Sequence, residues 1–166
     1  HGASAAGSGV GAARALRAQG SAPAGFFVYG TLRPDDDSGA AWTKGFCDGL
    51  RAEPATLPGA SMYIDGGYAA VSFEQTRCAV RGVLLRPSAR EGTQPHAEAM
   101  QQKLAEADRI ESFPDLYDRR VVSVRTAEGA EQLAYVYHRT GCTDRAKCVR
   151  VPDGDWLSRP RATSES

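Results

Sequence analysis

The run Phe26-Phe27-Val28-Tyr29 constrains the fold more than any other stretch of the chain. It is continuous, apolar and free of charge. Such a run predicts a strand buried on both faces, because a strand with one wet face alternates apolar and polar residues. Gly30-Thr31-Leu32 follows directly, and glycine permits an unusual turn or a close approach to a ligand. We therefore expect a core strand that ends in a turn whose backbone N–H groups can bind an anionic group. The alternative is that Gly30 simply begins a loop.

The length and charge of the chain limit its class and its partners. A chain of 166 residues fits one domain with its own core. Lys and Arg together number 20, as do Asp and Glu, so neither nucleic acid nor an anionic membrane is expected as the main partner. No apolar run has the length of a membrane-spanning helix. We predict a cytoplasmic protein, and the sequence does not define its oligomeric state.

The two ends of the chain differ from the middle. Residues 1–24 are mostly Ala, Gly and Ser, with arginines and with no acidic residue before Asp35. This composition predicts a disordered leader, and organelle targeting is the alternative. The polar residues 158–166 predict a disordered tail. Residues 25–157 are then expected to form one domain.

Neither the cysteines nor the acidic run predicts a metal site. Cys47, Cys78, Cys142 and Cys148 show no Cys-x-x-Cys spacing. We expect free thiols, and a Cys142–Cys148 pair stays open. Asp35-Asp36-Asp37 lacks the further ligands of a calcium loop, so a solvated loop is expected. The sequence therefore predicts no metal and no cofactor.

Several β-rich runs lie on either side of one helical pattern. The expected strands are residues 52–57, a hairpin of 61–64 and 68–73 around Asp65-Gly66-Gly67, residues 78–85, and a pair of 119–125 and 132–138 around Glu128-Gly129. A last turn at Gly154-Asp155-Trp156 is expected to pack Trp156 onto the body. His138 is expected to have a structural role on its strand.

The helical pattern begins at Pro95 and leads to an acidic residue. Met100, Leu104 and Ala107 share one face, and the next position on that face is Glu111. Burial disfavours an ionised carboxylate, so Glu111 is expected to bind a proton near neutral pH and to serve as a general acid and base.

Three other expectations concern this helix. Glu111 could instead lie at a frayed helix end, where it faces water or pairs with Arg119 or Arg120. Asp108, near the same face, is the rival carboxylate. His96, in the first turn, is expected to be exposed.

Two of these stretches resemble a known family. Tyr29-Gly30-Thr31-Leu32 is similar to the first signature of the gamma-glutamylcyclotransferase-like superfamily. The run Asp108-Arg109-Ile110-Glu111-Ser112-Phe113-Pro114-Asp115-Leu116-Tyr117-Asp118-Arg119 resembles the second, with spacing closest to gamma-glutamylaminecyclotransferases. Gly154-Asp155-Trp156 resembles a closing motif, so the resemblance covers residues 26–156. Ala107 stands where the family commonly has Leu, and Tyr68-Ala69-Ala70 where it often has Tyr-Pro-Ala.

The resemblance implies both a fold and a reaction. The fold would be α+β, a compact mixed β-barrel with flanking helices. The reaction would be cofactor-free release of 5-oxoproline from a small-molecule gamma-glutamyl substrate. Glu111 would be the catalytic acid and base, and the substrate-binding residues would be Tyr29, Gly30, Thr31, Leu32 and Tyr117. The departures leave the leaving group open. The alternatives are a non-catalytic binding or interaction module on the same barrel, and an enzyme of secondary metabolism that removes a gamma-glutamyl protecting group.

Overall fold

The computed structural model describes residues 22–73, 77–139 and 148–160. The strands are β1 (Gly25–Val28), β2 (Leu50–Pro58), β3 (Ser61–Asp65), β4 (Tyr68–Ser72), β5 (Ala79–Pro87), β6 (Asp118–Thr126), β7 (Glu131–His138) and β8 (Cys148–Val151). The helices are α2 (Gln94–Ile110) and the 3-10 helices η1 (Ala41–Cys47) and η2 (Trp156–Ser158).

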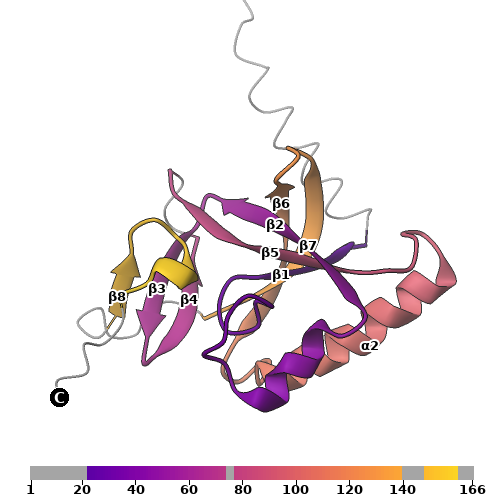
Figure 1. The fold of residues 1–166 in the computed structure, drawn as a ribbon, viewed down its shortest axis with the longest axis horizontal. Helices are drawn as coiled ribbons and strands as arrows, with labels where there is room; N and C mark the ends of the chain where they lie inside the picture. Colours follow the sequence, from indigo (N-terminus) through magenta and orange to yellow (C-terminus); the bar gives the residue numbers. More distant parts are fainter. Residues whose placement is uncertain (1–21, 74–76, 140–147, 161–166) are drawn as a thin grey trace, which may run out of the picture.

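Five strands form a closed barrel in the order β1-β5-β2-β6-β7. The pairs within it are antiparallel except the one that closes it, where β1 runs parallel to β7 and Phe26 lies opposite Tyr135. Helix α2 lies along one side of the barrel, and a sheet of β4, β3 and β8 lies on the other side (Figure 1). The predicted α+β fold, a mixed barrel with flanking helices, is confirmed.

Strand β1 is buried on both faces, as its sequence predicts. Phe27 and Tyr29 belong to one core cluster, which also contains Trp156. Phe26 and Val28 belong to a second cluster, formed against α2 and η1. Alternate residues of a strand point to opposite faces, so β1 forms the boundary between the two clusters.

The small sheet contains the predicted hairpin. Strands β3 and β4 pair from Ser61 opposite Ser72 to Asp65 opposite Tyr68. Gly66 and Gly67 have φ angles of 59° and 86°, and a two-residue hairpin turn of this kind needs positive φ at both positions. The sequence Asp-Gly-Gly therefore sets the register.

Helix α2 begins within one residue of the predicted Pro95, but one residue of its first turn is buried although the sequence predicted it to be exposed. The Thr93 hydroxyl accepts the His96 N–H at 3.4 Å, and Met100 and Ala107 are buried. His96 is also buried, with its Nε2 3.3 Å from the Ala24 carbonyl oxygen. The prediction that His96 is exposed was wrong, because His96 lies one helical turn before Met100 on the buried face.

Two further expectations need correction. Cys47 and Cys78 are free, but Cys148 is disulfide-bonded, so the prediction of free thiols was wrong for Cys148. Cys142 lies outside the described residues. The acidic run is not simply solvated, because Asp36 is only 5% exposed and accepts the backbone N–H groups of Ser38 and Gly39.

At both ends, residues just outside the predicted domain of residues 25–157 contact the folded core. The Ala24 N–H donates to the Leu133 carbonyl at 2.9 Å. The Arg159 guanidinium stacks on Trp156 at 4.0 Å, and Trp156 is buried as predicted. No helix in the described residues is long and apolar enough to cross a membrane.

Gly82 shows why a glycine interrupts a core strand. A Cβ at this position would lie 2.5 Å from the Val28 carbonyl oxygen and 2.7 Å from the Phe27 ring. We predict that Gly82→Ala lowers the free energy of unfolding by about 1–3 kcal/mol, because the core must shift to admit the methyl group. Gly45→Ala is the control, since its Cβ would meet nothing closer than 3.8 Å. Urea denaturation measures both variants, and equal stabilities would contradict the prediction.

Candidate functional site

The site is built around the end of α2, which a Schellman motif fixes. The Phe113 N–H donates to the Asp108 carbonyl at 2.9 Å, and the Ser112 N–H donates to the Arg109 carbonyl at 3.3 Å. Ser112 has a φ of 50°, the left-handed conformation that this motif requires. A cis peptide bond joins Phe113 and Pro114 just beyond. Glu111 is the C-cap residue, so its backbone is held by the motif and is not a frayed end.

Glu111 is half-buried, and burial raises the pKa of its carboxyl to about 7. Among the described residues, the carboxylate has no hydrogen-bond or ion-pair partner. An unpaired charge of this kind is disfavoured in a poorly hydrated place, which is the cause of the shift. Glu111 can therefore both accept and release a proton near neutral pH.

The arginines that could neutralise Glu111 are engaged elsewhere. Arg119 forms an ion pair with Asp108 and stacks on the Phe113 ring at 4.4 Å. Arg120 donates to the His138 imidazole at 3.3 Å. The alternative in which Glu111 pairs with one of these arginines was therefore wrong.

Asp108, the rival carboxylate, has a structural position. It accepts the Tyr137 hydroxyl as well as the Arg119 guanidinium. Because these donors engage both of its oxygens, Asp108 is less available to a substrate than Glu111 is. The structure thus separates two carboxylates of one helix, of which only Glu111 is unpaired.

Two buried tyrosines lie beside Glu111. The Tyr29 hydroxyl donates to the Tyr137 carbonyl at 2.6 Å, and the Tyr117 hydroxyl donates to the Ala69 carbonyl at 3.0 Å. Burial raises the pKa of both tyrosines, and the Glu111 charge raises each further. Both hydroxyls therefore stay protonated, and the three side chains lie near enough to interact electrostatically.

Residues 30–32, which we call the donor turn, have hydrogen-bonded carbonyls and unbonded N–H groups among the described residues. The carbonyls of Gly30, Thr31 and Leu32 accept, in that order, the Arg33 N–H at 3.0 Å, the Lys44 ammonium at 3.4 Å and the Cys47 thiol at 3.4 Å. Within the described part of the chain, the N–H groups of the turn have no acceptor. Free, adjacent backbone N–H groups are a typical anion-binding arrangement.

Gly30 brings the donor turn against the small sheet. A Cβ at Gly30 would lie 2.7 Å from the Ala69 Cβ. Ala69 is the residue whose carbonyl holds the Tyr117 hydroxyl. The absence of a side chain at Gly30 therefore lets the turn approach β4 and Tyr117.

Of the predicted site residues, Tyr29, Gly30, Glu111 and Tyr117 come together. Thr31 lies on the same turn, half-buried, whereas the Leu32 side chain is buried in the core cluster against α2. The Leu32 side chain is therefore part of the core and not of the site.

Sequence reasoning missed Arg139, which lies near the two tyrosines. Its guanidinium pairs with Asp65 at 2.9 Å and lies 5.6 Å from the Tyr117 ring. Its positive charge opposes the rise in the pKa of Tyr29 and Tyr117. No local pattern marks this residue, because its neighbours in space come from β3 and from the segment after α2.

The sequence model of one protein family covers this whole region. The family described as "Gamma-glutamyl cyclotransferase, AIG2-like" matches residues 26–158. The chain belongs to this family. The match includes every residue of the site described above, and it confirms the resemblance seen in the sequence. A search of curated proteins finds no match.

Solved structures support the fold of this family member. An AIG2-like protein from Mus musculus has a TM-score of 0.53 and 20% identity, covering 86% of this chain and 87% of that one. YkqA from Bacillus subtilis has a TM-score of 0.54 and 20% identity, covering 81% of this chain but 40% of the longer YkqA chain. A protein from Arabidopsis thaliana has a TM-score of 0.53 and 19% identity, covering 76% of this chain and 68% of that one. At these identities the likeness concerns the fold.

A cavity lies apart from the predicted site residues, and the described residues contain no candidate metal site. In residues 22–73, 77–139 and 148–160, no group of three or more His, Cys, Asp or Glu side chains is placed to hold a metal ion. A cavity of about 600 Å³ lies at the opposite end of α2 and is lined by residues that include Thr93, His96, Met100 and Tyr135. None of the predicted site residues lines it.

The pKa of Glu111 predicts how stability depends on pH. The folded state binds the Glu111 proton up to about pH 7, against an ordinary value of 4.5, so its contribution to stability falls as pH rises through this interval. Glu111→Gln cannot ionise. We predict that at pH 8 it raises the free energy of unfolding above wild type by at most about 3 kcal/mol, and that this difference vanishes below about pH 4.5.

Denaturant unfolding at several pH values measures this difference. Glu98→Gln is the matched control, since Glu98 is exposed on the same helix, and it should show no such trend. A wild-type-to-Glu111→Gln difference that stays constant from pH 4 to pH 8 would contradict a half-buried carboxylate with a raised pKa.

Proposed function

We propose that the protein is a gamma-glutamyl cyclotransferase that releases 5-oxoproline and a free amine from gamma-glutamyl-amine or gamma-glutamyl amino acid substrates. One observation carries the proposal. An unpaired Glu111 carboxyl with a pKa near 7 neighbours two buried tyrosines, next to a turn with free N–H groups. The family match supports this class of reaction.

The donor turn and the tyrosines would bind the glutamyl part of the substrate. Its N–H groups would donate to the α-carboxylate or to the developing oxyanion. The hydroxyls of Tyr29 and Tyr117 are engaged with backbone carbonyls. The two rings would therefore form fixed walls that limit water around the reacting atoms.

The proposed reaction is an intramolecular acyl transfer. The neutral α-amine attacks the γ-carbonyl carbon and forms the bond that closes a five-membered ring. The ring nitrogen then loses a proton to the Glu111 carboxylate. The bond from the γ-carbon to the leaving nitrogen breaks, and Glu111 returns the proton to that nitrogen. The proton that the α-ammonium loses to solvent before attack is matched by the one that the released amine gains from solvent.

The environment of Glu111 suits this proton transfer. An acid and base works best when its pKa lies near the working pH, because both protonation states are then accessible. An ordinary glutamate would be too weak a base for the α-amine. The attack is intramolecular. Binding the glutamyl group in the bent conformation that brings its α-amine to its γ-carbonyl therefore supplies much of the remaining rate acceleration.

Activity tests the role of Glu111 directly. We expect release of 5-oxoproline from at least one of gamma-glutamyl-lysine, gamma-glutamyl amino acids or glutathione. Glu111→Gln should lower kcat/KM by about 10²–10⁴-fold, because it removes the proton acceptor and retains the shape. Wild-type kcat/KM should fall below about pH 7, as the carboxylate becomes protonated.

Glu98→Gln is again the control and should keep wild-type turnover. Equal turnover by wild type and Glu111→Gln would exclude the proposed role of Glu111. Binding of 5-oxoproline without turnover of any gamma-glutamyl compound would identify a binding module instead of an enzyme.

A further inference from the structure

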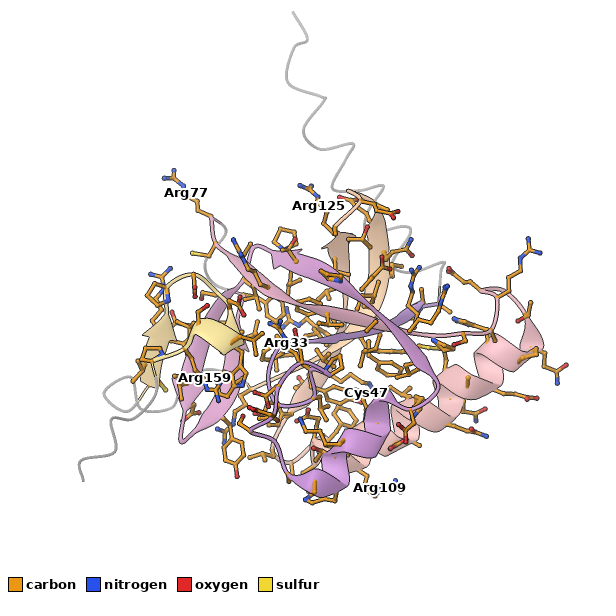
Figure 2. All side chains as sticks on the ribbon, viewed as in Figure 1. Arg33, Cys47, Arg77, Arg109, Arg125 and Arg159 are labelled. Atoms are coloured by element: carbon orange, nitrogen blue, oxygen red, sulfur yellow. The ribbon has the colours of Figure 1, made fainter. Side chains whose placement is uncertain are left out.

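Arg33, the residue after the donor turn, is a buried cation with two acidic partners. Only 6% of it is exposed. Its Nε and Nη2 donate to the two Asp35 oxygens, each at 2.8 Å, and its Nη1 donates to Asp155 Oδ1 at 3.1 Å. In Figure 2, Arg33 lies within the body, whereas Arg77 and Arg125 extend away from it. The planar fork of arginine fits such a bridge, and the point charge of lysine does not.

The main chain of the same residue closes the donor turn. The Arg33 N–H donates to the Gly30 carbonyl at 3.0 Å. Arg33 therefore joins the turn through its backbone to Asp155 through its side chain.

Asp155 is itself fixed to the body. Its Oδ1 accepts the Leu157 N–H at 3.1 Å and caps η2, in which Trp156 is 1% exposed. The carbonyl of the preceding residue, Gly154, accepts the Arg81 N–H of β5 at 2.8 Å. A displacement of Asp155 would therefore disturb both Trp156 and the barrel.

A second contact connects the loop after the turn to the same C-terminal segment. Arg159 stacks on Trp156 and donates to the Ser38 hydroxyl at 3.1 Å. Ser38 in turn donates to the buried Asp36 carboxylate at 2.9 Å. Among the described residues, the segment around Trp156 thus contacts the loop through Arg33 and through Ser38, and Arg33 is the one of the two that is hydrogen-bonded to the donor turn.

We propose that Arg33 is a positioning residue, whose ion pair with Asp155 holds the donor turn so that its N–H groups bind the substrate α-carboxylate. The inference rests on the proposed function and extends it, because it makes the C-terminal segment part of the substrate site. Without this ion pair the protein would still fold, but the N–H groups of the turn would no longer converge on one carboxylate. A small misplacement of groups that position a substrate lowers the reaction rate strongly.

Arg33→Lys and Asp155→Asn test this positioning. Lysine keeps the charge but cannot bridge both acids. Asparagine keeps an oxygen for the cap but loses the ion pair with Arg33. Arg86→Lys is the matched control, because Arg86 forms a half-buried pair with Glu53 on the barrel. Steady-state kinetics use the gamma-glutamyl compound that wild type turns over best.

The measured constants distinguish weaker binding of the carboxylate from a general loss of the active structure. For Arg33→Lys and Asp155→Asn we expect KM to rise by about 10–100-fold while kcat changes less than about threefold. The inhibition constant of 5-oxoproline, which keeps the carboxylate, should rise in parallel. That of 2-pyrrolidinone, the same ring without the carboxylate, should stay unchanged. Arg86→Lys should alter none of these constants.

Three outcomes would overturn the inference: both variants matching Arg86→Lys, equal loss of 5-oxoproline and 2-pyrrolidinone binding, or a fall in kcat with KM unchanged. Asp155→Asn carries the test alone if Arg33→Lys does not fold. Absence of wild-type turnover would instead overturn the proposed function. An active wild type with a fully active Arg33→Lys overturns the positioning role alone.

Discussion

The parallel pairing of β1 with β7 is the contact on which the site depends. It closes the barrel and sets Phe26 opposite Tyr135. Beyond the pair, Tyr29 donates to the Tyr137 carbonyl, and the Tyr137 hydroxyl donates to Asp108 on α2. A single strand pairing thus joins the donor turn at one end of β1 to the end of the helix that bears Glu111. Segments distant in the chain become one site because the barrel closes there.

The end of α2 assigns different tasks to two acids. Asp108 pairs with Arg119 and accepts the Tyr137 hydroxyl, which secures the helix to β6 and β7. Glu111, one turn later, is half-buried and has no partner among the described residues, and burial raises its pKa to about 7. Such a carboxyl destabilises the fold at neutral pH, and the Schellman motif and the surrounding core hold it in place. Proteins often keep a destabilising group of this kind at a functional site.

The sequence predicted what local patterns control. The charge-free run at Phe26 indicated a strand buried on both faces, the paired glycines indicated the hairpin turn, and the stripe from Met100 led to Glu111. It did not predict the Arg33–Asp155 bridge, the position of Arg139 or the burial of His96. The first two depend on which distant segment packs nearby, and neither spacing nor composition records that. The burial of His96 follows from its spacing of four residues to Met100, which the prediction for the first turn did not take into account. The family signatures identified Tyr29 and Tyr117, whose hydrogen bonds only the fold explains.

A crystal structure of the protein with bound 5-oxoproline tests the central claim most directly, because the product carries both groups that the site must recognise. The account predicts that its carboxylate accepts hydrogen bonds from the backbone N–H groups of residues 30–32, and that its ring N–H lies within hydrogen-bond distance of the Glu111 carboxyl. Product bound elsewhere, or a Glu111 side chain turned to solvent away from the ring, would contradict the account.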